Sequence, residues 1–151
     1  MPAVEIGASL TVPAKIDALS ECLKFVTAHA VEAGFTPSRL SEIELVVEEV
    51  VSNICRHGYD DEPGQLELRC RRVDARRLLV EFIDCGRPFD ILAAPPPDLT
   101  VGVDQREVGG LGVPLIRAMV DEASYRREGN RNILRLSVRA ERSMPGAPAT
   151  S

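Results

Sequence analysis

Residues Val46 to Tyr59 read VVEEVVSNICRHGY. Their apolar positions recur every three to four residues, which predicts a helix with one buried face, and Gly58 is typical of the residue that ends a helix. Asn53 lies inside this helix, although an Asn amide competes for backbone hydrogen bonds and disfavours a helix interior. The stretch therefore predicts a helix that keeps one polar residue for a reason other than helix formation.

The segments before this helix predict a strand and a further helix. Apolar and polar residues alternate near the N-terminus, as in a strand with one buried face. A stripe of apolar residues at helical spacing follows, and Thr36 with Pro37 then forms a typical N-cap and first turn. The expected elements are a strand over residues 4–12, a helix that starts at Pro13 and ends at Gly34, and a helix from Thr36 to about His57.

The segments after this helix predict two hairpins, a long loop and one more helix. The expected elements are a hairpin of residues 65–73 and 78–84, a loop over 85–108, a Gly-rich turn at 109–112 that leads into a helix, and a hairpin around Gly129-Asn130. Loops of this length inside a domain are usually functional. The order of elements predicts the α+β class, a two-layer sandwich with helices on one face of a mixed, mainly antiparallel sheet.

The composition is that of one globular domain, expected to cover residues 1–140, followed by a disordered tail over 141–151. The chain has 151 residues and a net charge of -5, which disfavours general binding to nucleic acid. No apolar run approaches the ~18 residues that span a bilayer, and the N-terminus lacks the pattern of a signal peptide. We therefore expect a cytoplasmic protein that contacts neither nucleic acid nor membrane directly.

The four cysteines and two histidines show no pattern typical of a metal site or a disulfide framework. No Cys-x-x-Cys pair occurs, and the histidines are too far apart for a helical ligand pair. We expect the cysteines to be ordinary buried or half-buried thiols. No metal site made by protein side chains alone is expected.

Glu49 and Asn53 are one helical turn apart and lie in one column along the flank of the buried face. Glu48 points to the other side of the helix. A carboxylate and an amide oxygen at this spacing suit a hard cation with a water molecule nearby. The pair has a second interpretation, in which Glu49 is solvated and Asn53 caps or bonds a neighbouring backbone group.

Two further features suit a ligand. Asp84 ends an apolar strand and precedes Gly86, so a buried carboxylate there needs a donor such as the exocyclic amine of a base, and the glycine allows a flat ring to approach. A strand-end Asp that starts a turn is the alternative. The run GGLG over residues 109–112 exposes backbone N–H groups before a helix, which suits an anion, although it is neither a Walker A loop nor a complete G-x-G-x-x-G fingerprint.

Together these motifs resemble those of a known superfamily. E-x-x-x-N (Glu49 to Asn53), D-x-G-x-x-F (Asp84 to Phe89) and G-x-G-x (Gly110 to Val113) are similar to the N, G1 and G2 boxes of the GHKL ATPases and kinases. The anti-sigma-factor serine kinases of the RsbW and SpoIIAB type share more, since VxEAVxNxxxHGY, PFD and GGLG are typical of them. The resemblance covers roughly residues 4–138.

The resemblance implies a Bergerat-type α/β sandwich that binds ATP or ADP with Mg²⁺, under a lid of about residues 87–108. It implies that Glu49 is the general base, that Asn53 holds Mg²⁺ through the nucleotide and that Asp84 bonds the adenine amino group. The further nucleotide-binding residues that it implies are Gly86, Arg106, Gly109, Gly110, Leu111 and Gly112. Some relatives have a basic residue where Val108 stands here, so Arg106 is the nearest cation and the contact to the γ-phosphate stays open.

The resemblance also implies an activity and partners. The expected protein is a Ser/Thr protein kinase and anti-sigma factor of a bacterial partner-switching system, and is expected to be a homodimer. It would phosphorylate a STAS-domain antagonist and sequester a sigma factor or another regulated protein. One alternative is a non-catalytic module that sequesters partners. Another is the detached ATP domain of a histidine kinase, but His29 on the first helix lacks the adjacent acidic residue of a phospho-acceptor.

Overall fold

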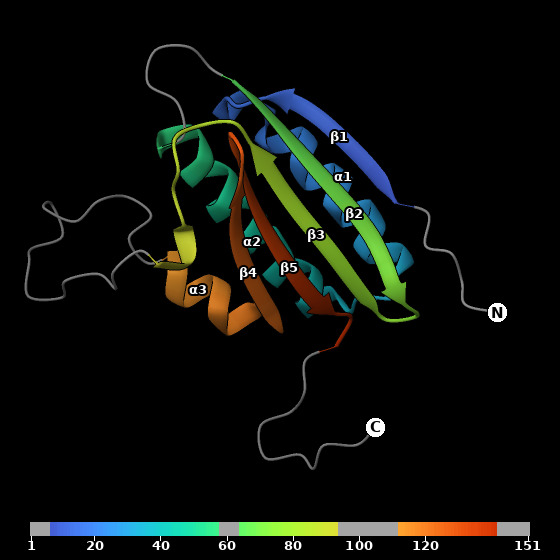
Figure 1. Cartoon of the computed structure of the whole chain (residues 1–151). Helices are drawn as coiled ribbons and strands as arrows, with labels where there is room; N and C mark the ends of the chain where they lie inside the picture. Colours follow the sequence, from blue (N-terminus) through green and yellow to red (C-terminus); the bar gives the residue numbers. More distant parts are fainter. Residues whose placement is uncertain (1–6, 58–63, 94–111, 142–151) are drawn as a thin grey trace, which may run out of the picture.

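A sheet and a layer of helices form the structure, a computed structural model that describes residues 7–57, 64–93 and 112–141 (Figure 1). The helices lie together on one face of the sheet, and α3 lies beside α2. The elements are β1 (Ala8–Pro13), η1 (Ile16–Ala18), α1 (Leu19–Glu32), α2 (Pro37–His57), β2 (Gln65–Asp74), β3 (Arg77–Asp84), η2 (Ile91–Ala93), α3 (Gly112–Met119), β4 (Glu122–Glu128) and β5 (Arg131–Arg139). The turns η1 and η2 are single 3₁₀ turns.

The strand order is β1-β2-β3-β5-β4, and every described pairing is antiparallel. β2–β3 and β4–β5 are hairpins, and Gly129 forms the second turn with a φ of 59°, a conformation that favours glycine. β3 and β5 pair at the centre, where Phe82 lies opposite Leu134. The α+β class is confirmed. The sheet was predicted to be mixed and mainly antiparallel, but every pairing among the described strands is antiparallel.

One hydrophobic core lies between the sheet and the helices. Alternate residues of β3 face this core, and Leu78, Val80 and Phe82 are each 1% exposed. Val26 of α1 and Val50 of α2 reach the same core with equal burial. Burial of side chains of this size contributes roughly 1.5–3 kcal/mol each, so the core fixes the helices against the central strands.

The helix expected from Pro13 begins later than the sequence predicted. Pro13 is instead the last residue of β1, opposite Gln65 of β2. The Ala14 N–H then donates to the Gly64 carbonyl oxygen at 2.8 Å. Because strand pairing keeps the chain extended this far, the helix α1 begins only at Leu19, after the turn η1.

The other helix boundaries follow the predicted signals. Gly34 follows α1 with a φ of 83°, and Thr36 caps α2 because its Oγ1 accepts a hydrogen bond from the Arg39 N–H at 3.2 Å. α3 begins at Gly112, the last residue of the GGLG run, with Pro114 in its first turn as expected.

Four of the expected segments and the expected helix stop at Gly58 lie wholly or partly outside the described residues. The parts outside are residues 4–6 of the first strand, residues 94–108 of the long loop, residues 109–111 of the Gly-rich turn and residues 142–151 of the tail. Within its described part, the long loop contains η2.

Cys22 and Cys70 are fully buried in the core. Burial raises the pKa of the Cys22 thiol to about 11 and that of the Cys70 thiol to about 12, so both are neutral at neutral pH and weak nucleophiles. None of the four cysteines forms a disulfide, although Cys85 is exposed where a buried or half-buried thiol was expected. The described residues hold no group of three or more His, Cys, Asp or Glu side chains placed to bind a metal. Among the described helices, none has the length and apolar content needed to cross a bilayer.

Candidate functional site

Glu49 and Asn53 interact directly on the flank of α2. Asn53 is 6% exposed, and its Nδ2 donates to the Glu49 backbone oxygen and to the Glu49 Oε2, both at 2.7 Å. Both amide hydrogens are thereby used. The second interpretation, in which Asn53 bonds a neighbouring backbone group, is therefore correct for the amide nitrogen. Its Oδ1 makes no hydrogen bond to any described residue and remains available as an acceptor. Glu48 is exposed on the other side of the helix, as expected.

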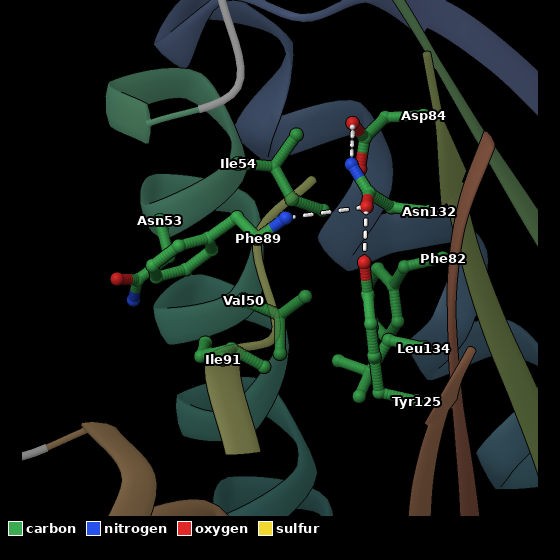
Figure 2. Close-up of a pocket in the computed structure, with 10 residues that line it drawn as sticks. All are labelled: Val50, Asn53, Ile54, Phe82, Asp84, Phe89, Ile91, Tyr125, Asn132 and Leu134. Atoms are coloured by element: carbon green, nitrogen blue, oxygen red, sulfur yellow. Dashed lines mark hydrogen bonds between the residues drawn. The ribbon is translucent and has the colours of Figure 1, made fainter. Parts of the chain in front are cut away.

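A small pocket lies between α2 and the sheet, beside this pair (Figure 2). Its wall is mostly apolar, and Asp84 is its one acidic residue. The lining residues are Val50, Asn53 and Ile54 of α2, Phe82 and Asp84 of β3, Phe89 and Ile91 after β3, Tyr125 of β4, and Asn132 and Leu134 of β5. The pocket therefore joins the polar flank of α2 to the end of the central strand.

Asp84 presents one unused oxygen to this pocket. The side chain is 5% exposed, and its Oδ1 accepts hydrogen bonds from the Gly86 N–H at 2.9 Å and from Asn132 Nδ2 at 3.0 Å. The other carboxylate oxygen has no hydrogen bond to a described residue. A buried acceptor without a donor is costly, so this oxygen suits a ligand that brings an N–H group.

Asn132 holds this arrangement together and was missed from the sequence. Its Nδ2 donates to Asp84 and to the Arg87 backbone oxygen at 2.8 Å, while its Oδ1 accepts from the Tyr125 hydroxyl and the Phe89 N–H. Figure 2 shows this row of groups running from Asp84 through Asn132 to Tyr125. A signal was present, because Asn is depleted in strands and here stands directly before the apolar residues Ile133 and Leu134.

Gly86 is fixed at the start of the segment that leaves the sheet. Its N–H bonds Asp84, and its carbonyl oxygen accepts a hydrogen bond from Arg127 Nη1 at 2.8 Å. Arg127 also donates to Asn132 Oδ1 at 3.2 Å, so the side chains of β4 and β5 clamp this turn.

The structure brings part of the predicted site together. Asn53 and Asp84 line the same pocket, while Glu49 bonds Asn53 and Gly86 bonds Asp84. Gly112 begins α3, the helix that packs beside α2. The remaining predicted residues, Arg106, Gly109, Gly110 and Leu111, lie outside the described part of the chain.

The sequence profile of the family described as Histidine kinase-like ATPase domain matches residues 12–138. The chain belongs to this family. The match runs from the end of β1 to Val138 in β5 and includes every described residue that lines the pocket. The resemblance inferred from the three motifs is confirmed.

Members with a curated name are similar over most of their length. The Serine-protein kinase RsbW of Halalkalibacterium halodurans is 28% identical over 123 residues, which cover 79% of this chain and 75% of the relative. The protein of the same name in Bacillus subtilis is 29% identical over 75% of this chain and 73% of the relative. The Anti-sigma F factor of Thermoanaerobacter pseudethanolicus is 28% identical over 64% of this chain and 67% of the relative.

Two solved structures share the fold. The RsbU and RsbW domains of Rv1364c from Mycobacterium tuberculosis match with a TM-score of 0.63 and 18% identity, over 89% of this chain and 32% of that longer chain. The histidine kinase domain of Erythrobacter litoralis EL346 matches with a TM-score of 0.51 and 20% identity, over 85% of this chain and 62% of that chain. The two-layer arrangement is therefore shared with these two structures.

Proposed function

We propose that this protein is an ATP-dependent Ser/Thr protein kinase and an anti-sigma factor. The observation that carries the proposal is that two residues lining one pocket, Asn53 on α2 and Asp84 on β3, each keep one oxygen that bonds no described residue. The first suits a hard cation and the second an amino group, so the two ends of the pocket fit Mg²⁺ with phosphates and an adenine base. The names of the relatives, serine-protein kinase and anti-sigma F factor, support the same function.

Asp84 would select the adenine base. Its Oδ1 is held by two donors, so only the other oxygen can accept a hydrogen bond from the base amino group. The apolar walls from Val50, Phe82 and Leu134 would exclude water from the faces of the ring. Gly86 holds the carboxylate through its N–H, which leaves the carboxylate little freedom to turn away.

Asp84→Asn is expected to shift the preference of the pocket from a base with a 6-amino group toward a base with a 6-oxo group. The two donors that hold Oδ1 must keep the amide oxygen, so the amide NH₂ turns into the pocket and meets the base with a donor. ATP affinity should fall about 10- to 100-fold, because a hydrogen bond to a charged group is replaced by two opposed donors. Inosine triphosphate, which carries a 6-oxo acceptor, should gain relative to ATP.

Calorimetric titration with both nucleotides measures this shift. Asp74→Asn is the matched control, because Asp74 is the exposed last residue of β2 and, among the described residues, its carboxylate interacts only with the Arg76 N–H and with Arg77. If Asp84→Asn left the ATP to inosine triphosphate preference unchanged, Asp84 would not be the base-selecting group.

The start of α3 would meet the phosphates. The first turn of a helix has unpaired N–H groups and the positive end of the helix dipole, which favour anions. Gly112 is the first residue of α3 and has no side chain to hold a phosphate away from the backbone.

Gly112→Val should therefore weaken ATP binding by about tenfold or more, with little effect on adenosine, which lacks phosphates. Ala118→Val is the control, since it places the same valine side chain at an exposed position of the same helix. The affinities for ATP and adenosine measure the effect. Unchanged ATP affinity in Gly112→Val would remove α3 from the phosphate site.

Glu49 would act as the general base of phosphoryl transfer. The carboxylate is fixed by Asn53 Nδ2, so it is positioned beside the Asn53 oxygen that would hold Mg²⁺. There it would accept the proton of the attacking Ser or Thr hydroxyl as the hydroxyl oxygen forms its bond to phosphorus and ADP leaves. The bound Mg²⁺ would supply neutralisation of the phosphate charge.

The names of the relatives, serine-protein kinase and anti-sigma F factor, support a protein substrate and a sigma factor as partners. We propose a STAS-domain antagonist as the substrate and a sigma factor or another regulated protein as the sequestered target. The kinase domain would cover residues 1–140, and the protein would act as a homodimer in the cytoplasm.

The test is incubation with radiolabelled ATP and a separate acceptor protein. Acid-stable phosphoserine or phosphothreonine supports the kinase, and acid-labile phosphohistidine would contradict it. ATP binding without any transfer would instead indicate a non-catalytic sequestering module.

A further inference from the structure

Arg39 is a buried arginine that the proposed chemistry does not use. It is the third residue of α2 and is 2% exposed. Its Nε donates to the Arg139 backbone oxygen at 2.8 Å, and its Nη1 donates to the Glu42 Oε1 at 3.0 Å. Its Nη1 also donates to the Met119 backbone oxygen, and its Nη2 to the Asp121 Oδ2 at 2.9 Å. All three guanidinium nitrogens therefore have acceptors, two of which are carboxylates.

Three elements, α2, α3 and β5, meet at this guanidinium together with the connection between α3 and β4. Met119 is the last residue of α3, and Arg139 is the last residue of β5. Asp121, between α3 and β4, also accepts the Arg139 N–H at 2.7 Å and donates its own N–H to the Ser137 oxygen at 2.9 Å. The first turn of α2 is thus tied to the final turn of α3 and to the end of the sheet.

The contact with Met119 fixes the end of α3. The last carbonyl oxygens of a helix have no partner within it and carry the negative end of the helix dipole. A guanidinium placed there satisfies one of them and complements the dipole, and its planar fork holds several acceptors in one geometry. The same helix is also held by Ile116, whose side chain is fully buried in the core.

The two helices leave this junction toward the proposed nucleotide site. α3 has eight residues, so its first residue Gly112 lies only about 10 Å along the axis from Met119. α2 extends from Arg39 past Glu49 to Asn53, and Figure 1 shows α3 alongside it. An arginine that joins the two helices at one end therefore sets the relative placement of their functional groups at the other.

We propose that Arg39 is a positioning residue for phosphate binding. It holds the start of α3 at the distance from Glu49 and Asn53 that the phosphates require, without touching the nucleotide. The inference rests on the proposed function, because it needs the start of α3 to meet the phosphates. If Arg39 were only structural, its substitution would change the stability of the fold but would leave the ratio of ATP affinity to adenosine affinity unchanged.

Titration of the full chain with ATP plus Mg²⁺, and separately with adenosine, tests the proposal. Arg39→Lys keeps the charge but cannot make the four contacts of the guanidinium. Arg39→Met removes the charge as well. In both folded variants ATP affinity should fall about tenfold, while adenosine affinity stays within about twofold, because none of the described residues that line the base pocket is on α3.

Arg135→Met is the matched control. Arg135 forms an ion pair with Glu81 at 3.0 Å on the face of the sheet away from the helices, so its loss removes one charge but touches neither α2 nor α3. This variant should bind ATP and adenosine as the unaltered protein does. An effect of net charge alone would instead appear equally in Arg135→Met and Arg39→Met.

Each outcome is decisive. Equal weakening of ATP and adenosine in the Arg39 variants, or weakening of neither, would overturn the positioning role. Should Arg39→Met fail to fold, Arg39→Lys and Asp121→Ala carry the test, since Asp121 is part of the same junction and its side chain is 27% exposed. If the unaltered protein binds ATP no more tightly than adenosine, the proposal that α3 binds the phosphates is wrong. This result is distinct from the results that would contradict the positioning role of Arg39.

Discussion

We expect Glu49→Gln to stop phosphotransfer to a Ser or Thr acceptor while ATP binding is retained, and this is the largest effect that we predict. The amide can still accept the hydrogen bond from Asn53 Nδ2, so Asn53 keeps its orientation and the pocket keeps its shape. What is lost is the basicity that takes the hydroxyl proton. General bases of this kind contribute about 10²- to 10⁴-fold to the rate, and the transfer rate should fall by that factor. Glu49→Ala should behave in the same way, because the Glu49 backbone oxygen still holds Asn53 Nδ2.

The measurement is single-turnover transfer from radiolabelled ATP, with ATP affinity measured on the same preparations. Glu48→Gln is the matched control, since Glu48 is the adjacent residue, carries the same charge and is exposed on the other side of α2. Its transfer rate should equal that of the unaltered protein. Transfer at full rate in Glu49→Ala would show that another group accepts the proton.

Asn53→Ala has the second largest expected effect, the loss of Mg²⁺-dependent nucleotide binding. The substitution removes Oδ1, the oxygen that makes no hydrogen bond to a described residue, and leaves the Glu49 carboxylate without its amide donor. In the presence of Mg²⁺, ATP affinity should fall about 10- to 100-fold, as for other polar groups that support a bound metal. Without Mg²⁺ the variant and the unaltered protein should bind ATP alike.

Calorimetric titration with and without Mg²⁺ separates the two conditions. Ser52→Ala is the control, because Ser52 is the preceding residue of α2, is partly exposed and does not line the pocket beside Asp84. Equal Mg²⁺ dependence in Asn53→Ala and the unaltered protein would falsify the role of Asn53.

The helical part of the site was predictable because it is local. Glu49 and Asn53 are one turn apart, so the helical repeat alone places them in one column, and the structure joins them by two hydrogen bonds. Asp84 was likewise predictable as the polar end of an apolar strand. In each case the geometry follows from residues within a few positions of one another.

The residues that support the site were not predictable in the same way. Asn132 meets Asp84 across 48 positions of sequence, and Arg39 meets Asp121 across 82. Such contacts depend on how β5 pairs with β3 and where α3 ends, and no short pattern contains that information. The late start of α1 has a similar cause, because Pro13 forms part of a strand only through its pairing with Gln65 of β2.

The single free oxygen of Asp84 has a consequence for regulation. The adenine base is the same in ATP and ADP, so a site that grips the base cannot tell the two nucleotides apart, and only the groups on α2 and α3 can. The ADP left by each turnover would therefore occupy the place that the next ATP needs. When adenine nucleotides are abundant, the share of protein that carries ATP would follow the ratio of ATP to ADP, and the protein would report the energy state of the cell instead of the concentration of either nucleotide.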